Sequence, residues 1–514
     1  MVMGGIFFTI NTMVDTNNKQ EKFEKVISLS KRRGFIFPGS EIYGGLANTY
    51  DYGPMGVELM RNIRNLWWEE FVHRRDDIVG LEASLISHQE IWKASGHVGG
   101  FSDAQVDCKK CKARMRADHL IEGYYDEQLK IQDENDKKGN GSSVPIFTVD
   151  ENNWISNIVD KKTRNRQVEG LTPEKMDEVI QHFQIKCPNC KEHDWTHVRK
   201  FNLLFPVHVG IIEGDQDLAY LRGETAQGMF VAFKNILDSS RVKLPFGVAQ
   251  VGKSFRNEIT PGNSVFRTLV FEQAEIEYFF DPEEQDWENL YEDWKSKLFS
   301  FVSEKLGIRK ENLRWRVHTD DERSFYSKRT EDLEYNYPFG FKELWGLAYR
   351  TDYDLSQHEK FSGKELRVVD SSNGRKILPH VIEPAVGVDR MFLMVLSDAY
   401  TEEDARVVLK IAPRIAPVKV AVFPLLANKE ELMNRAREIY SNLKTHIQGV
   451  VMFDARGNIG KRYLSQDEIG TPFCITVDFE SFEDDTVTVR ERDSAEQVRV
   501  KMDELVSYIA KKIV

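Results

Sequence analysis

Residues 248–280 read VAQVGKSFRNEITPGNSVFRTLVFEQAEIEYFF, and this stretch decides the fold. We interpret its first part as a β-strand, in which successive side chains point to opposite faces. Pro261, Gly262 and Asn263 then supply a turn signal. A returning strand follows and runs to Phe280. We therefore expect a β-hairpin whose two strands carry the chemistry of the chain.

The predicted hairpin carries side chains suited to a nucleotide. A period of two places Arg256 and Glu258 on one face of the first strand. It places Phe271, Gln273 and Glu275 on one face of the returning strand. An arginine fork matches a phosphate, and a purine is bound by an aromatic plane and a carboxylate. An ordinary charged hairpin surface has the same composition, so both interpretations stay open.

A second segment, residues 380–393, reads HVIEPAVGVDRMFL. The pattern predicts an apolar strand, a turn with proline and glycine, and a helix that begins near Val388. Arg390 then lies in the first turn, where the helix dipole and free N–H groups favour anions. The alternative is an arginine paired with Asp389 or another nearby acid.

A helix is predicted to begin at Pro54, because proline is favoured at the first helical position. Its apolar residues fall on two faces, Val57, Met60, Trp67 and Phe71 on one, and Leu59, Ile63 and Leu66 on the other. A helix that is apolar on two sides packs against two surfaces. We expect a subunit interface in addition to its own core, with a simple buried helix as the alternative.

Four of the five cysteines form two Cys-x-x-Cys pairs, Cys108 with Cys111 and Cys187 with Cys190. Such pairs in a reducing compartment favour a metal over disulfides, and four thiolates complete a closed, structural zinc site. Free thiols are the alternative. Cys474 stands alone in an apolar run and is expected to be an inert core residue.

The 514 residues indicate several domains, and the net charge of −12 neither supports nor excludes a nucleic-acid partner. The cysteine pairs bracket an inserted module, residues 108–200, with a charged, Gly/Ser-rich break at 132–143. A boundary near residues 412–417 precedes a small mixed α/β domain, whose last helix is predicted over 500–513. No apolar run reaches the roughly 20 residues of a membrane span, so we expect a cytoplasmic protein without membrane association.

The helix after Pro54, the hairpin and the 380–393 segment occur in the order of the three motifs of class II aminoacyl-tRNA synthetases. Over nearly its whole length the chain resembles the homodimeric glycyl-tRNA synthetases. The stretches that carry this resemblance, beyond the three motifs, are residues 34–45, 51–59, 94–97, 116–118 and 221–228.

The resemblance implies an α+β fold, with an antiparallel sheet and flanking helices, the cysteine-pinned insertion and a C-terminal anticodon-binding domain. The implied catalytic domain has two parts, residues 18–107 and 201–412. The insertion separates them, and the anticodon-binding domain spans residues 416–514. In that domain Arg456, Lys461 and Arg462 are candidates for contacts with RNA, with a solvated charged surface as the alternative.

The implied enzyme is a glycine–tRNA ligase that uses ATP and Mg²⁺ to form glycyl-adenylate and transfers glycine to the 3′ end of tRNA(Gly). The implied partners are glycine, tRNA(Gly) and a second copy of the chain, with a structural Zn²⁺ in the insertion. Glycine has no smaller competitor, so a filled pocket is sufficient to reject other amino acids by overlap.

The resemblance also implies roles for single residues. Arg256 and Arg390 are the catalytic residues, Arg256 on the α-phosphate, and Glu258 binds the adenine amino group. Phe271 stacks on adenine, with Arg390 on the other face of the base. The full set expected around ATP is Arg256, Asn257, Glu258, Phe266, Arg267, Phe271, Glu343, Leu344, Gly387, Asp389 and Arg390, with Glu343 as the Mg²⁺ ligand. The set expected around glycine is Arg116, Glu224, Phe271, Gln273, Glu275, Glu383, Ala385 and Gly387.

Four positions depart from the family pattern. The family usually has arginine where Gly262 stands and an Arg-Glu pair where Leu269 and Val270 stand. A serine is usual at the position of Ala385. These departures favour, as an alternative, a catalytically impaired synthetase-like accessory protein that binds tRNA or another nucleic acid. An enzyme of the same class for another small amino acid is a further alternative, and the retained phosphate arginines favour an active enzyme.

Overall fold

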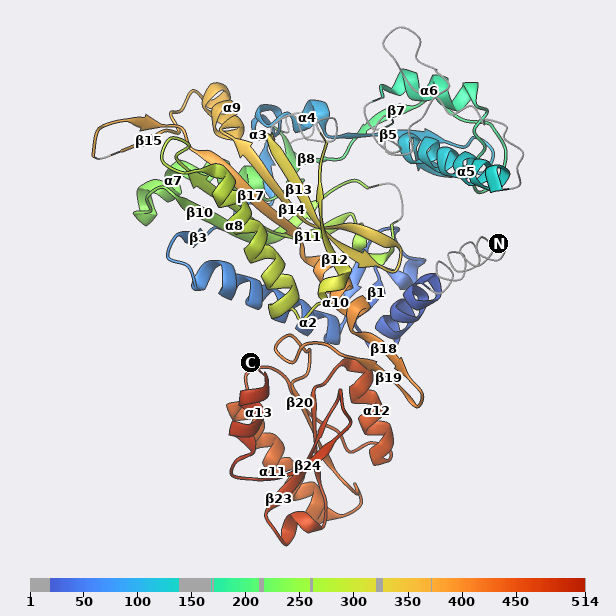
Figure 1. Cartoon of the computed structure of the whole chain (residues 1–514), viewed down its shortest axis with the longest axis vertical. Helices are drawn as coiled ribbons and strands as arrows, with labels where there is room; N and C mark the ends of the chain where they lie inside the picture. The colour runs from blue at the N-terminus through green and yellow to red at the C-terminus, as the bar shows by residue number, and fades with distance from the viewer. Residues whose placement is uncertain are drawn as a thin grey trace.

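The computed structural model describes residues 19–137, 168, 171–211, 217–258, 262–319, 327–370 and 372–513. A large sheet with its helices forms the middle of the molecule (Figure 1). The insertion module lies at the upper right of this view, and the C-terminal domain lies below the sheet. No helix of the described ranges has the length and apolar character to cross a membrane.

The central sheet has seven strands in the order β12-β13-β14-β17-β11-β10-β3. All neighbours are antiparallel except β10 and β3, which are parallel. The strand bounds are β3 (Ile78–Gly80), β10 (Phe246–Phe255), β11 (Val270–Phe280), β12 (Leu313–Val317), β13 (Arg329–Tyr337), β14 (Gly340–Thr351) and β17 (His380–Gly387). The antiparallel sheet expected from the sequence is confirmed.

The hairpin is the pair β10 and β11, with Phe246 opposite Phe279 and Phe255 opposite Val270. One part of the prediction is wrong. Strand β10 ends at Phe255, so Arg256 and Glu258 lie beyond it and strand alternation does not bring them together. The backbone turns there, and the Glu258 N–H donates to the carbonyl of Arg256 at 2.7 Å.

Helices α2 (Pro54–Trp68) and α10 (Val388–Ala399) contact each other and belong to the same core as the sheet. Proline is the first residue of α2, as predicted. Gly56 allows α2 to pack closely against the backbone of Phe35, because a Cβ there would lie 1.9 Å from the Phe35 carbonyl oxygen. Residues of both predicted faces are buried, among them Leu59, Ile63 and Trp67, whereas Val57 is exposed.

The rest of the catalytic region surrounds this sheet. It begins with a helix over residues 19–32, whose N-terminal side lies outside the described residues. The strands are β1 (Ile36–Pro38), β2 (Tyr50–Tyr52), β4 (Ile86–His88), β8 (Phe205–Val209), β9 (Asp217–Leu221), β15 (Val368–Val369), β16 (Lys376–Ile377), β18 (Tyr400–Glu403) and β19 (Arg406–Leu409). The α-helices are α3 (Gln89–Ala94), α4 (His97–Gly100), α7 (Ala226–Ser240), α8 (Trp287–Ser300) and α9 (Tyr353–Ser362). Short 3₁₀ or π turns are η1 (Glu41–Tyr43), η2 (Glu69–His73), η3 (Ser264–Phe266), η4 (Phe301–Lys305) and η5 (Lys310–Asn312).

The insertion module contains β5 (Ser102–Asp107), β6 (Arg114–Arg116), α5 (Ala117–Lys137), α6 (Pro173–His182) and β7 (Arg199–Asn202). Strands β5 and β7 pair with Ser102 opposite Asn202, so the ends of the module meet. Residues 132–137 of the predicted break belong to α5, and that part of the prediction is wrong. The remainder of the predicted break, 138–143, lies outside the described residues.

The C-terminal domain is a five-stranded mixed sheet in the order β21-β20-β22-β23-β24, with its own core. Its elements are β20 (Val420–Pro424), α11 (Glu430–His446), β21 (Val451–Phe453), α12 (Ile459–Ile469), β22 (Phe473–Val477), η6 (Glu480–Phe482), β23 (Thr486–Glu491), β24 (Gln497–Lys501) and α13 (Leu505–Ile513). The predicted start of the last helix at Val500 is wrong, because Val500 pairs with Val487 across β23 and β24. Cys474 is buried in β22, as predicted.

Candidate active site

A cavity of about 300 Å³ lies where the hairpin, the start of α10 and strand β6 of the insertion meet. Nine of the residues expected around ATP line it, namely Arg256, Glu258, Phe266, Arg267, Phe271, Glu343, Gly387, Asp389 and Arg390. Of those expected around glycine, Arg116, Phe271, Gln273, Ala385 and Gly387 line it. The fold therefore brings residues from four distant parts of the sequence to one concave site.

The two arginines expected to be catalytic have aromatic neighbours in this cavity. The Arg256 guanidinium lies 5.2 Å from the Phe271 ring centroid, and its Nε donates to the Gly223 carbonyl at 3.0 Å. The Arg390 guanidinium lies 4.5 Å from the ring centroid of Phe266. Arg390 thus lies over Phe266, and Arg256 lies over Phe271, the ring expected to stack on adenine.

Arg390 is also ion-paired with Glu343, with Nη1 2.9 Å from Oε2. This contact is of the kind left open as the alternative for Arg390, an arginine paired with a nearby acid. Arg390, ahead of the opposing effect of burial, lowers the pKa of Glu343 and keeps it ionised. A carboxylate half-exposed at a cavity has the chemistry to bind a hard cation such as Mg²⁺.

Leu344 is fully buried in the core and does not line the cavity. Strands β13 and β14 change register here, with Leu333 opposite Trp345 and Glu334 opposite Glu343. Leu344 is the extra residue of this β-bulge. The bulge turns Glu343 toward the cavity and the leucine side chain inward, so the expected contact of that side chain with ATP is wrong.

Asp389 is held by protein partners. Its carboxylate accepts a hydrogen bond from the Glu272 N–H at 2.6 Å and another from the hydroxyl of Tyr52. It is buried, and burial raises its pKa. Asp389 therefore ties the first turn of α10 to β11 and β2, and this fixes the position of Arg390.

Arg116 enters the cavity from strand β6 of the insertion module. Its guanidinium pairs with Asp103 at 3.4 Å and, more closely, with Asp118. Burial raises the pKa of Asp103, ahead of the opposing effect of Arg116. The two acids hold the arginine at the cavity wall, so the insertion completes the site.

The three glutamates expected around glycine are not among the residues that line the cavity; Glu224 and Glu275 are buried, and Glu383 is partly buried. The Glu224 carboxylate is 3.1 Å from His97 Nε2, and Glu275 accepts a hydrogen bond from the Thr225 hydroxyl. Burial opposes ionisation of Glu224, yet the neighbouring His97 holds its pKa below the ordinary value.

Sequence reasoning missed Arg350, which accompanies these acids. Its guanidinium is buried, bonds both oxygens of Asp354 at 2.8 and 2.9 Å and pairs with Glu383. The one signal in the sequence is the spacing of four between Arg350 and Asp354, which is common on helix surfaces. Asn257, also expected near ATP, instead donates its N–H to the Leu203 carbonyl and does not line the cavity.

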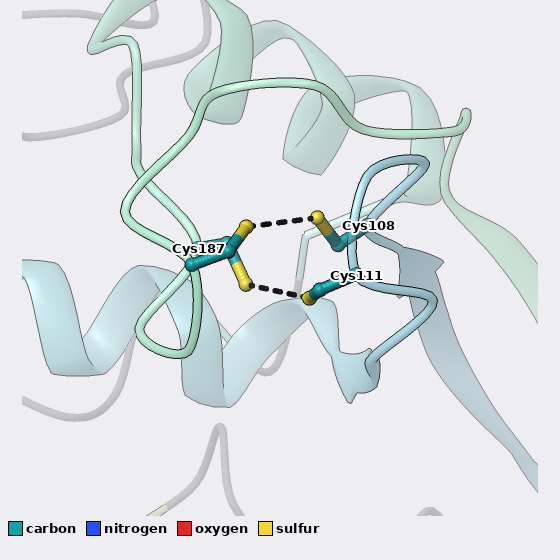
Figure 2. Close-up of side chains that lie close together, drawn as sticks. Cys108, Cys111 and Cys187 are labelled. Atoms are coloured by element: carbon teal, nitrogen blue, oxygen red, sulfur yellow. Dashed lines mark hydrogen bonds between the residues drawn. The ribbon is translucent and has the colours of Figure 1, made fainter.

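The four paired cysteines face one another in the insertion module (Figure 2). The Sγ atoms of Cys108 and Cys190 are 3.6 Å apart, and those of Cys111 and Cys187 are 3.7 Å apart. Tetrahedral zinc with bonds of about 2.3 Å separates its sulfur ligands by about 3.8 Å, so this spacing fits the ion.

The two cysteine loops have the same backbone form. The Cys108 N–H donates to Ala113 and the Cys187 N–H to Glu192, each at 2.8 Å. Lys112 and Lys191 both have positive φ, 61° and 63°. Two matching turns that direct four sulfurs to one point have the geometry of a closed structural metal site. Cys108 and Cys187 also belong to the core of the module.

The departures from the family pattern have structural correlates at two positions. A Cβ on Gly262 would lie 2.9 Å from the Cβ of Arg267, so a side chain at 262 requires a local shift. Ala385 lies opposite Glu275 across β17 and β11. Leu269 is half-buried and Val270 is exposed, and nothing in the structure explains the exchange of an Arg-Glu pair for these two residues.

One candidate in the C-terminal domain is structural. Arg462 is 2% exposed and donates to the carbonyls of Pro424 and Gly457, so the prediction that it contacts RNA is wrong. The contacts of the other two candidates with RNA stay predictions. The Arg456 side chain is 88% exposed, and Lys461, in the first turn of α12, is exposed as well.

Three family models match consecutive parts of the chain. They are "Glycyl-tRNA synthetase insertion domain 1" at residues 103–203, "tRNA synthetase class II core domain (G, H, P, S and T)" at 209–399 and "Anticodon binding domain" at 419–512.

Curated relatives and a solved structure extend this likeness. The glycine–tRNA ligase of Clostridium acetobutylicum is 47% identical over 502 residues, which is 96% of this chain and all of the relative. That of Geobacillus thermodenitrificans is 46% identical over 507 residues, 98% of this chain and all of the relative. A prolyl-tRNA synthetase structure from Cryptosporidium parvum shares the fold, with a TM-score of 0.59 and 14% identity over 95% of this chain and 74% of its own.

Proposed function

The chain belongs to the glycine–tRNA ligase family of class II aminoacyl-tRNA synthetases, and from this premise we propose how its residues carry out the reaction. It is an enzyme that joins glycine to tRNA(Gly). Enzymes of this class generally use ATP and Mg²⁺. The assignment of single residues, zinc, the oligomeric state and the location of the protein are our proposals.

The observation that carries the proposed mechanism is the composition of the cavity. Arg256, Arg267 and Arg390 line it together with the aromatic rings of Phe266 and Phe271. Guanidinium groups bind phosphates through paired N–H donors, and an aromatic face stacks on a purine. Both parts of ATP therefore find partners in one site.

On the nucleotide side, Arg256 binds the α-phosphate, and Arg267 and Arg390 bind the γ-phosphate. Phe271 stacks on adenine, and Glu258 accepts a hydrogen bond from its amino group. The Arg267 Nε atom is 3.8 Å from a Glu258 carboxylate oxygen. Glu343 would hold Mg²⁺, which supplies charge neutralisation to the phosphates when bound.

On the glycine side, Arg116 pairs with the carboxylate, and Glu224, Glu275 and Glu383 surround the ammonium. The carboxylate oxygen of glycine attacks the α-phosphorus in line, and pyrophosphate leaves toward the arginines. The protein supplies position and field, so the reaction requires no side-chain nucleophile. The terminal ribose hydroxyl of tRNA(Gly) then attacks the glycyl-adenylate, and AMP leaves.

We propose Zn²⁺ as the occupant of the four-cysteine site. Cys108, Cys111, Cys187 and Cys190 would provide a complete thiolate shell with no position for water, which is the property of a structural site. His193 and His197 make hydrogen bonds to other groups and are not needed as ligands. Zinc analysis of protein purified without chelator tests this, and a stoichiometry near zero would contradict it.

We propose a homodimer built on the outer face of α2. Arg61, Arg64, Asn65 and Trp68 project from this face and, with Val251, line a shallow cavity of about 450 Å³. A Trp and two Arg side chains are typical of a central interface patch. Light scattering of the Trp68→Glu variant tests the proposal, and an unchanged dimer would show that another face is used. A cytoplasmic location rests on the family alone.

The decisive experiment is ATP–pyrophosphate exchange with glycine, alanine, serine and proline offered separately. We expect exchange with glycine and none above background with the other three. Exchange with serine alone would overturn the substrate. Absence of exchange with all four would support the alternative of a catalytically impaired accessory protein.

A further inference from the structure

Glu277 is a buried glutamate that the proposed mechanism does not use. It belongs to β11, where it shares a face with Glu275, and its side chain is 0% exposed. Neither of its carboxyl oxygens has a hydrogen-bond partner within the described part of the protein. A buried ionised carboxylate without a partner is strongly disfavoured, so this group needs an explanation.

Glu277 points into a cluster of acids. The carboxyl oxygens of Glu275, Glu277 and Glu383 lie within 4.8 Å of one another. The register of β11 and β17, with Glu275 opposite Ala385 and Tyr278 opposite Ile382, sets Glu277 across from Glu383. Like charges in directly opposite positions of a sheet destabilise it.

The cations near the cluster are already engaged. Arg350, from β14, bonds both oxygens of Asp354 on α9 as well as Glu383. Glu224, which precedes α7, is a further acid near the cluster, and His97 lies beside it. Glu275 accepts from Thr225. Among the described residues, Arg350 is the cation that acts on Glu277, and it is shared with Asp354 and Glu383.

These observations are consistent with an uncharged Glu277. Burial, reinforced by Glu383 and Glu275, raises the pKa of Glu277 well above its usual range. Burial also raises the pKa of Glu275 and of Glu383, but Glu275 accepts a hydrogen bond from Thr225 and Glu383 pairs with Arg350, contacts that favour the ionised form and that Glu277 lacks. A neutral carboxylic acid has one O–H donor, and carboxyl oxygens of Glu275 and Glu383 lie within 4.8 Å of that group.

We infer that Glu277 is a positioning residue for glycine, a neutral acid whose carboxyl group faces the carboxylates of Glu275 and Glu383 and orients them. This inference rests on the proposed function, in which those two glutamates surround the glycine ammonium. Glu277 also keeps one negative charge out of the cluster. The remaining carboxylates then present oxygens to the ammonium in a fixed arrangement.

The test compares Glu277→Ala with Glu277→Gln in ATP–pyrophosphate exchange. Alanine removes the donor, and we expect the KM for glycine to rise about tenfold or more. Glutamine keeps a donor and nearly the same shape, and we expect it to restore this KM to within about threefold of the unchanged protein. The KM for ATP should stay within about twofold in both variants, because Arg256 and Phe271 are untouched.

Two results would overturn the inference. If Glu277→Gln weakens glycine binding as much as Glu277→Ala, a negative charge is required and the acid is not neutral. If Glu277→Ala leaves the KM for glycine unchanged, the residue does not position the cluster. Unchanged protein that shows no exchange with glycine would instead contradict the proposed function, so the two failures are distinguishable.

Infrared difference spectra of unchanged protein against Glu277→Gln provide a second measurement, which also decides the matter if the alanine variant does not fold. We expect the C=O stretch of one buried neutral carboxylic acid to disappear in the variant. The band should persist in the unchanged protein with saturating glycine and with added Mg²⁺. Absence of the band, or its loss on adding Mg²⁺ alone, would contradict a neutral Glu277 and indicate a cation held by the three carboxylates.

Discussion

Seven strands and two apolar clusters hold the catalytic sheet, whereas the insertion module combines a small core with four facing cysteines. The catalytic region accommodates charged groups whose burial is energetically unfavourable, such as the buried Arg350 and the acids around it. The module buries far less apolar surface and is expected to depend on a cross-link, as small domains often do. The two regions should therefore respond differently to the loss of a side chain: the catalytic region in activity or local stability, and the insertion module through loss of its metal site.

Removing an arginine from the cavity should have the largest effect, and it should be confined to chemistry. We expect Arg256→Ala and Arg390→Ala each to lower glycine activation by about 10³-fold or more, equivalent to about 4 kcal/mol, because phosphate charge loses its partner. Pyrophosphate exchange measures the loss. Lys310→Ala, an exposed control on the same domain, should be silent. Near-normal exchange in either arginine variant would remove that residue from the phosphate site.

A break in the buried ion pairs should cost a free energy of similar size, and the loss should appear in stability. Asp354→Ala leaves the Arg350 guanidinium buried with one acid fewer, which costs about 3–5 kcal/mol. Hydrogen exchange of the β14 amides measures the local stability. Asp404→Ala, at an exposed position, is the control. A loss below about 1 kcal/mol would mean that the core does not depend on this pair.

Removal of the metal from the insertion module should lower the activity indirectly, through the position of Arg116. With a chelator, or in Cys187→Ser, we expect the module to loosen, Arg116 to lose its fixed position and glycine activation to fall about tenfold. Cys474→Ala is the matched control, since that cysteine lies in the C-terminal core. Metal content, hydrogen exchange of α5 and exchange kinetics are measured together. Full activity in metal-free protein would show that the module and the cavity are independent.

The smallest expected effect is on the pH dependence of stability, which tests whether the pKa of Glu277 is raised in the folded protein. The pKa of Glu277 is raised in the folded protein, so folded protein binds more protons than unfolded protein above the ordinary glutamate range, and stability falls as pH rises. In Glu277→Gln, this fall of stability with rising pH is absent. We expect the variant to be more stable than unchanged protein at neutral pH, with the difference vanishing near pH 4. Parallel stability curves at all pH values would contradict a raised pKa.

Local patterns were sufficient to predict much of the architecture. Pro54 gave the start of α2, the alternation to Phe280 gave the returning strand, and Gly387 with Val388 gave the start of α10. These features depend on neighbouring residues along the chain. The last helix was misplaced because Val500 is apolar in either a helix or a strand, and only its pairing with Val487 decides.

Most of the residues that line the cavity were predicted from the sequence, but the relative positions of their side chains were predicted less well. Leu344 faces the core because a bulge in β14 shifts the alternation by one residue. The positions of Arg390 over Phe266 and of Arg256 over Phe271 depend on tertiary packing. Arg350 was missed for a related reason. A buried arginine is recognised by its acid partners, and Glu383 is 33 positions away in the sequence.

The pairing of Ser102 with Asn202 makes the module separable from the fold around it. Adjacent antiparallel strands can be closed by a two-residue turn, so a chain could gain or lose these hundred residues without rebuilding the sheet. Such a deletion would also remove Arg116. A chain without the module would keep the central sheet and the arginines proposed to bind the nucleotide. Comparing the two chains would show what the module contributes to the selection of the amino acid.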